Sequence, residues 1–195
     1  MLEGGQGTGE AAQGIIPALT KSAHDALSAE QYDNAAQLFA RVVTADTTDP
    51  GLLTPYMEAV TALGNQDQTV AVLNQLHTAY NRIISEPPAE PGRAQQEQAQ
   101  LLVGMTTAYG RLGHYESAMT CATGVFALQP DNPEVDFLRR ITGGENPSVV
   151  AQGLKAQASE AFGQNRIHLG RKFEEKATMA ALAGRPPMPG DTVVR

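Results

Sequence analysis

A short motif recurs along this chain at a spacing that a pair of helices would produce. The stretch 113–118 reads Gly-His-Tyr-Glu-Ser-Ala, and the stretch 30–35 reads Glu-Gln-Tyr-Asp-Asn-Ala. A weaker copy, 64–69, starts 34 residues after the first, and the third copy starts 49 residues later, which is 34 plus an insertion of 15. One helix-turn-helix unit cannot bury its apolar face alone. This period therefore predicts a stack of such units.

Glycine and proline divide the chain into helical and non-helical segments. The segment 85–93 holds three prolines and a glycine, so no helix is expected to cross it. Residues 1–14 hold five glycines and almost no bulky side chains. The expected organisation is a flexible arm at 1–14, a helical repeat domain at 15–144 with its insertion loop at 85–93, C-terminal helices at 145–183 and an extended tail at 184–195.

The first helix is expected to begin close to Ile15. Apolar residues follow at spacings of three and four, which is the period of one helix face, and Ile15 and Ile16 open this series. Pro17 is expected in the first turn of the helix, where its missing N–H does no harm.

The composition favours closely packed small helices over a β-sandwich. Apolar residues make up 42% of the chain, but aromatic residues only 5%, and tryptophan is absent. The net charge of −7 argues against general nucleic-acid binding, which depends on lysine and arginine neutralising phosphates. No apolar run is long enough to predict a membrane-spanning helix.

The recurring unit resembles the tetratricopeptide repeat (TPR) family, over roughly residues 17–142. The third copy carries the large and small packing residues of that family at Leu102, Tyr109, Gly113, Tyr115, Ala118, Val125 and Pro130. The second copy departs most, with Gln66 and Thr69 where an aromatic and a small residue are typical. The resemblance implies an all-α fold, namely a TPR-like α-solenoid of about three helix-turn-helix pairs with extra C-terminal helices.

In TPR proteins the first helix of each pair lines a concave groove that binds a peptide or a partner helix. By this resemblance, the partner-binding candidates are Thr20, His24, Leu27, Thr54, Glu58, Thr61, Gln100, Val103, Thr107 and Arg111. These residues do not form the cluster of lysine, asparagine and arginine with which some TPR domains clamp a carboxylate. The groove is therefore expected to bind a partly apolar polypeptide, although each residue on its own also fits an ordinary solvated helix face.

No residue pattern predicts a catalytic, metal or cofactor site. The glycine-rich stretch 4–9 lacks the lysine and serine or threonine of a phosphate-binding loop. The histidines show no i,i+4 pair. Cys121, the single cysteine, is expected to be a small buried thiol in a helix. We therefore expect no enzyme activity, no cofactor and no metal.

The C-terminal segment concentrates basic residues within an acidic chain. These are Arg166, His168, Arg171, Lys172 and Lys176. They could meet an acidic partner, but pairing with their neighbours Glu160, Glu174 and Glu175 is favoured, because charge pairs within exposed helices are common. The arm and the tail are hypothesised to lie against other chains in a larger assembly.

These observations predict a non-catalytic TPR adaptor or scaffold that binds a partner polypeptide and supports assembly of a multiprotein complex. A small acidic TPR secretion chaperone that holds an export substrate, and an accessory subunit of an enzyme complex, stay open as alternatives. The first residues lack a basic segment followed by an apolar core, so a cytoplasmic location is expected, with export after removal of a signal left open.

Overall fold

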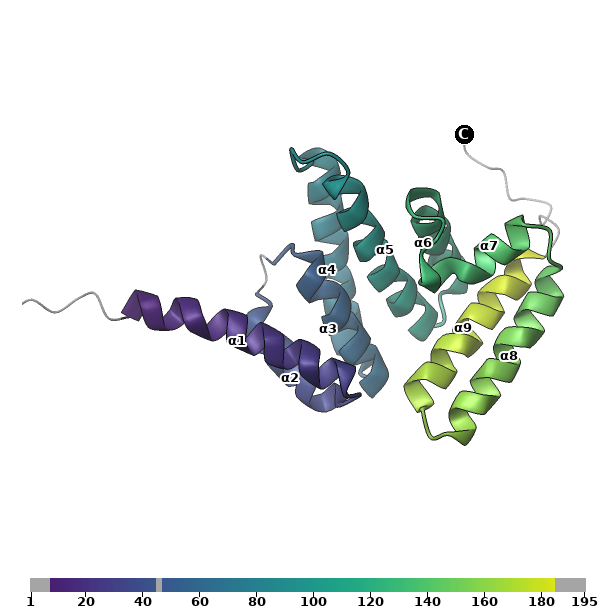
Figure 1. Ribbon diagram of the computed structural model, residues 1–195, viewed down its shortest axis with the longest axis horizontal. Helices are drawn as coiled ribbons and strands as arrows, with labels where there is room; N and C mark the ends of the chain where they lie inside the picture. Colours follow the sequence, from purple (N-terminus) through teal and green to yellow (C-terminus); the bar gives the residue numbers. More distant parts are fainter. Residues whose placement is uncertain (1–7, 45–46, 185–195) are drawn as a thin grey trace, which may run out of the picture.

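A computed structural model describes residues 8–44 and 47–184, and these ranges contain helices and no strand (Figure 1). The all-helical prediction is confirmed for this part of the chain. The elements are α1 (Thr8–Ser28), α2 (Tyr32–Val42), α3 (Pro50–Leu63), α4 (Gln66–Ser85), α5 (Arg93–Arg111), α6 (Tyr115–Leu128), η1 (Pro133–Val135), α7 (Asp136–Thr142), α8 (Pro147–Gly163) and α9 (Ile167–Ala183).

Short polar side chains and glycines define the helix ends. The backbone N–H of Gly51 donates to Asp49 Oδ1 at 2.8 Å, which caps α3. Asn65 and Asn146 cap α4 and α8 in the same way. Gly64 ends α3 with φ of 72°, a left-handed conformation that favours glycine. The helix ends at Asp49, Gly64 and Asn146 therefore each have a local physical cause.

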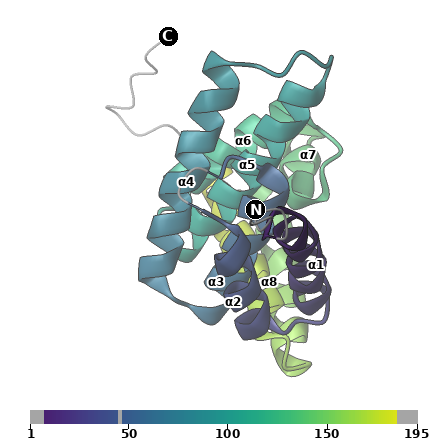
Figure 2. The same ribbon diagram turned by 90° about the vertical axis from the view of Figure 1, so that its left-hand side faces the viewer.

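The helices from α1 to α6 pack in chain order. Each helix contacts the next, and α3 also packs along α5 and contacts α1. The loop between α4 and α5 extends beyond the packed helices (Figure 2), as expected from its prolines. Helices α1, α3 and α5 therefore contact one another in series.

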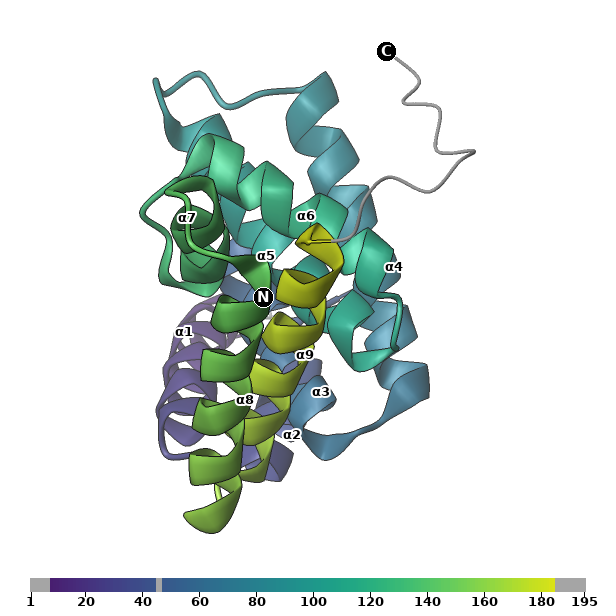
Figure 3. The same cartoon turned by 90° about the vertical axis from the view of Figure 1, so that its right-hand side faces the viewer.

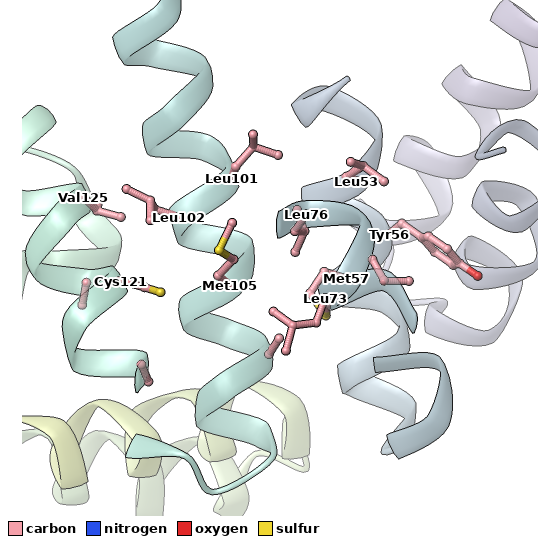
Figure 4. Packing of buried hydrophobic residues seen from close by; sticks show 14 of the residues in the cluster. Leu53, Tyr56, Met57, Leu73, Leu76, Leu101, Leu102, Met105, Cys121 and Val125 are labelled. Carbon is pink, nitrogen blue, oxygen red and sulfur yellow. The ribbon is translucent and has the colours of Figure 1, made fainter. Parts of the chain in front are cut away.

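A continuous apolar layer lies between α3, α4, α5 and α6. Figure 4 shows Leu53, Leu76 and Leu101 pointing toward one another from three different helices, and none of these side chains is exposed. Leu102 of α5 points toward Val125 of α6 (Figure 4), and a Cβ at Gly124 of α6 would lie 3.0 Å from Leu102 Cδ1. Small residues allow the close approach: a Cβ at Gly104 would lie 3.0 Å from Leu76 Cδ1. Burial of this layer removes water from large side chains and provides the main driving force for folding.

The start of α1 differs from the prediction. The helix begins at Thr8, inside the segment expected to be a flexible arm, and residues 1–7 lie outside the described residues. Pro17 consequently lies inside the helix rather than in its first turn. Ile15 and Ile16 are 54% and 56% exposed, because α1 extends past the end of α2 and no other helix covers them (Figure 1). These two residues share the helical period of the buried residues of α1 without being buried themselves.

Helices α8 and α9 form a C-terminal hairpin. Helix α9 lies between α8 and the rest of the molecule, where it contacts α5, α6 and α7 (Figures 1 and 3). Helix α8 packs chiefly against α9 and otherwise contacts α7. The expected tail lies outside the described residues from residue 185 onward. In the described residues, no helix is long and apolar enough to cross a membrane.

The contact between α8 and α9 leads to a prediction at Gly170. A methyl group at this position would overlap the ring of Phe162 on α8. Gly170→Ala is therefore expected to destabilise the protein by about 1–3 kcal/mol, since the ring must move within a packed interface. Chemical denaturation measures the effect. Gly153→Ala is the matched control, because open space surrounds Gly153 in α8, and a gain of about 0.5–1 kcal/mol is expected there. Equal effects at both glycines would contradict the packing argument.

Candidate functional site

The predicted partner-binding residues lie on α1, α3 and α5, and half of them lie against α9. We call the ten predicted residues the first-helix face. Glu58, Val103, Thr107 and Arg111 lie close to residues of α9, and Leu27 lines a hollow that α9 completes. The surface that the sequence assigns to another polypeptide is thus partly covered by a helix of the same chain.

Helix α9 presents one stripe of residues to this face. The stripe comprises His168, Lys172, Glu175, Lys176 and Met179, and we call it the α9 stripe. Its members recur at spacings of three and four and therefore lie on one side of the helix. Met179 is 2% exposed, and with Val103 and Thr107 it lines a residual cavity of only about 20 Å³. The apolar end of the stripe is thus closely packed, whereas the remainder makes charged contacts.

Glu58 is the acidic member of the first-helix face that meets α9. Its Oε1 atom lies 3.3 Å from Lys172 Nζ and 3.5 Å from His168 Nε2. Contact with His168, together with the charge of Lys172, lowers the pKa of Glu58 to about 2 although burial opposes the change. Glu58 is therefore ionised across the physiological range and binds the basic side of α9.

A second carboxylate, that of Glu134 in η1, was not predicted from the sequence. Its two oxygens accept from Lys172 at 3.3 Å and from Lys176 at 2.8 Å. Burial alone would raise the pKa of Glu134, but the two lysines lower it below its ordinary value. Asn132 caps η1 by accepting from the Glu134 N–H, which orients this turn. The Asn-Pro-Glu sequence predicts a turn at this position. It does not predict that the carboxylate of Glu134 contacts α9, which lies about forty residues later in the chain.

Arg111 and Glu175 form the most buried charge pair of the site. Their side chains are 10% and 12% exposed, and Arg111 Nε lies 3.0 Å from Glu175 Oε1. The approach is poorly aligned, so Arg111 Nε and Nη1 are buried without a hydrogen-bond partner. Burial raises the pKa of Glu175 to about 7 despite the neighbouring guanidinium. Burial likewise lowers the pKa of Arg111. This pair holds α9 at an electrostatic cost.

The N-terminal end of α9 reaches back to the first helix pair. Arg166 Nη2 donates to Glu30 Oε1 at 2.7 Å across 136 positions of sequence. The rings of Tyr32 and His168 lie 5.0 Å apart. A hollow of about 310 Å³ opens here between Leu27, these residues and α9. The C-terminal hairpin therefore contacts the first pair of helices as well as α5 and α6.

The remaining members of the first-helix face lie away from α9. Thr54 Oγ1 donates to Gln100 O at 2.9 Å and so links α3 to α5. Thr61 is buried and donates to Met57 O within its own helix, which leaves it no surface for a partner. Thr20 is half-buried, whereas His24 and Gln100 are exposed. His24 and Gln100 are thus the predicted residues that present the most open surface.

Comparisons with protein-family models, with curated proteins and with solved structures find no match for this chain. The functional argument therefore depends on the geometry of the first-helix face and of the helix that covers it.

The basic residues near the C-terminus form ion pairs with acidic residues other than the predicted ones, so the prediction of their partners is wrong. The favoured interpretation paired them with Glu160, Glu174 and Glu175 of the same hairpin. In the structure, Lys172 and Lys176 pair with Glu134, and Lys172 also pairs with Glu58, because α9 turns this side toward α3 and η1. The basic residues hold the hairpin against the other helices.

Two further features of the described residues concern metal binding and an open apolar groove. No group of three or more histidine, cysteine, aspartate or glutamate side chains is placed to hold a metal ion among residues 8–44 and 47–184. An open apolar groove of about 450 Å³ runs between α6, α7 and the end of α9. It is lined by Met119, Phe126, Leu138, Ile141 and Leu182, among others.

Cys121 provides a prediction about reactivity. It is 9% exposed, and burial raises the pKa of its thiol to about 11. At pH 8 only about one thiol in a thousand is ionised, and the thiolate is the reactive form. Modification by a disulfide reagent is therefore expected to be at least about 100-fold slower in the native protein than in denaturant. Comparable rates in both states would show that the thiol is accessible.

Proposed function

We propose that this chain is a non-catalytic adaptor with a TPR-like α-solenoid fold, and that its first-helix face binds a partner polypeptide during assembly of a protein complex. Two features of the packing support the solenoid. The pairs α1–α2, α3–α4 and α5–α6 follow one another along the chain, and the first helices of neighbouring pairs also contact each other. This is the contact pattern of stacked helical repeats.

The observation that carries the proposal is the position of α9. It lies on the residues to which the resemblance assigns partner binding, including Glu58, Val103 and Arg111. A surface that accommodates one helix through charge pairs and an apolar contact has the chemistry to accommodate a helix of another protein. The still exposed His24 and Gln100 provide the open edge at which such a partner would first make contact.

Site-specific photo-crosslinking tests this proposal. A photoreactive amino acid is placed at His24 or at Gln100 in the full chain, and at the exposed Gln157 on α8 as the matched control. The expected result is a discrete crosslinked protein from the two first-helix positions and not from Gln157, identified by mass spectrometry. Equal crosslinking at all three positions, or no product from His24 and Gln100, would contradict binding at this face.

A further inference from the structure

We propose that the first-helix face together with Glu134 is a recognition site for a basic amphipathic helix of a partner protein, and that α9 occupies this site as an intramolecular competitor. This inference rests on the proposed function and adds to it the chemistry of the partner and a way to regulate its binding. The partner helix carries two cationic side chains one turn apart and an apolar side chain three residues later, as Lys172, Lys176 and Met179 do on α9.

The charge of the site selects a basic partner. Glu58 and Glu134 approach α9 from different elements, and both are ionised at neutral pH because their pKa values lie below the ordinary value. Lys172 is within 3.3 Å of both carboxylates, and Lys176 reaches the second one. If α9 left, two carboxylates would face one another across the surface. A neutral or acidic helix would not compensate them, whereas a helix with lysines at this spacing would.

The apolar part of the site selects a helix rather than an extended chain. Val103 and Thr107 of α5 and Val135 of η1 surround Met179. The residues of the α9 stripe meet these groups only because a helix returns to the same side after three or four residues. An extended segment points successive side chains to opposite sides and cannot place both lysines and the methionine on one surface.

The C-terminal hairpin can leave as a unit. Helix α8 packs chiefly on α9, so the hairpin keeps most of its own apolar contacts when α9 separates from α5 and α6. Residues 143–146 join it to α7, and Gly144 has φ of 100°, a conformation that only glycine adopts readily. Separation breaks the ion pairs of the α9 stripe and the pair between Arg166 and Glu30, and it exposes the apolar contact of Met179 with α5 and η1.

The contact that α9 makes is also imperfect. Arg111 Nε and Nη1 are buried without a hydrogen-bond partner, although Nε lies 3.0 Å from Glu175 Oε1. Each such group costs about 1–3 kcal/mol relative to a satisfied one. A partner helix that aligns an acceptor with Arg111 gains this free energy, which α9 does not obtain. The difference allows a partner to displace α9 even though α9 has the advantage of being tethered.

Displacement is tested with the full chain and a peptide of residues 164–184. The chain is labelled with ¹⁵N so that its amides are distinguished from those of the peptide in hydrogen exchange by mass spectrometry. Excess peptide is expected to accelerate exchange of the α9 amides of the chain at least 10-fold and to leave α3 and α4 unchanged. The control peptide with Lys172→Glu and Lys176→Glu is expected to have no effect. Unchanged exchange of α9 at saturating peptide would overturn displacement.

A second measurement does not depend on the natural affinity of α9. The full chain with Lys172→Gln and Lys176→Gln weakens the contact in cis while both carboxylates of the site stay in place. It is expected to bind the fluorescent wild-type peptide at least 10-fold more tightly than the wild-type chain does. Equal affinities would overturn the competition. A stable dimer that exchanges hairpins between copies would show that the occupant is a second copy, and would overturn recognition of another protein.

The two proposals fail separately. If the peptide neither binds nor displaces α9 but His24 and Gln100 still crosslink a partner, the adaptor function stands and the basic-helix chemistry is wrong. If the peptide displaces α9 but no partner crosslinks, the site recognises a basic helix and the adaptor function is wrong.

Discussion

Glu134→Gln is expected to lower the free energy of unfolding by about 2–4 kcal/mol. The substitution keeps the size of the side chain and removes the charge that compensates Lys172 and Lys176, whose side chains are only 15% and 17% exposed. Lys172 retains Glu58, but Lys176 loses the one carboxylate within ion-pair distance of it in the described residues. The expected loss of stability is smaller than for a fully buried ion pair because the Glu134 side chain is 34% exposed, and solvent screens its charge.

Urea denaturation of the full chain measures this effect. Glu160→Gln is the matched control, because Glu160 lies exposed on α8 and its replacement is expected to change stability by less than about 0.5 kcal/mol. Adding Lys176→Met to Glu134→Gln removes the unpaired ammonium and is expected to recover part of the loss. If Glu134→Gln behaves like Glu160→Gln, the ion pairs of α9 contribute nothing measurable to docking.

The stability of the protein is expected to fall as the pH rises from about 4.5 to 7 because of Glu175. Burial raises the pKa of this carboxyl group from 4.5 to about 7 in the folded state. The folded state therefore binds a proton in this range that the unfolded state has already lost. By linkage, the stabilisation that Glu175 provides is fully present below pH 4.5 and is lost as the pH rises through 7. This loss lowers the free energy of unfolding by up to about 3 kcal/mol.

The charged groups facing Glu175 are Arg111 from α5 and Arg171, Lys172 and Glu174 from its own helix. Glu175→Gln is expected to remove the decrease between pH 5 and 7, whereas Glu174→Gln at the exposed neighbouring position leaves it in place. Denaturation at several pH values measures both slopes. A wild-type profile that is the same as that of Glu175→Gln in this range would show that the carboxyl group has no raised pKa.

Glu58 and Glu134 act in a different pH range. Their pKa values lie below the ordinary value, so their contribution is present above about pH 4.5 and is lost as the pH falls, toward about 2 for Glu58. The contact between α9 and the first-helix face is therefore expected to be strongest near pH 4.5–5, where Glu175 is protonated and the other two carboxylates are ionised.

The ends of the helices could be predicted from the sequence because their causes are local. Asp49 and Asn146 accept from N–H groups two residues away, and Gly64 adopts a backbone conformation that other residues avoid. The loop around 85–93 follows from the geometry of proline alone. These features need no knowledge of the rest of the chain, so a linear sequence is sufficient to place them.

The candidate site could be predicted only in part. Periodicity and the resemblance place Glu58, Val103 and Arg111 on one side of their helices, since the helical repeat is a property of the backbone. Periodicity does not predict which other segment of the chain packs against that side of a helix. Ile15 and Ile16 belong to the same pattern as the buried residues of α1, yet they are exposed because α2 is too short to cover them.

The sequence by itself determined most of the helix ends, though not the start of α1, together with which sides of the helices are apolar and that basic residues gather near the C-terminus. Only the tertiary structure decided that those basic residues meet Glu58 and Glu134 rather than their own neighbours, and that α9 lies on the first-helix face. The reason is physical: an ion pair forms according to distance in space. The position of α9 depends on packing against α5 and α6 that no local pattern encodes.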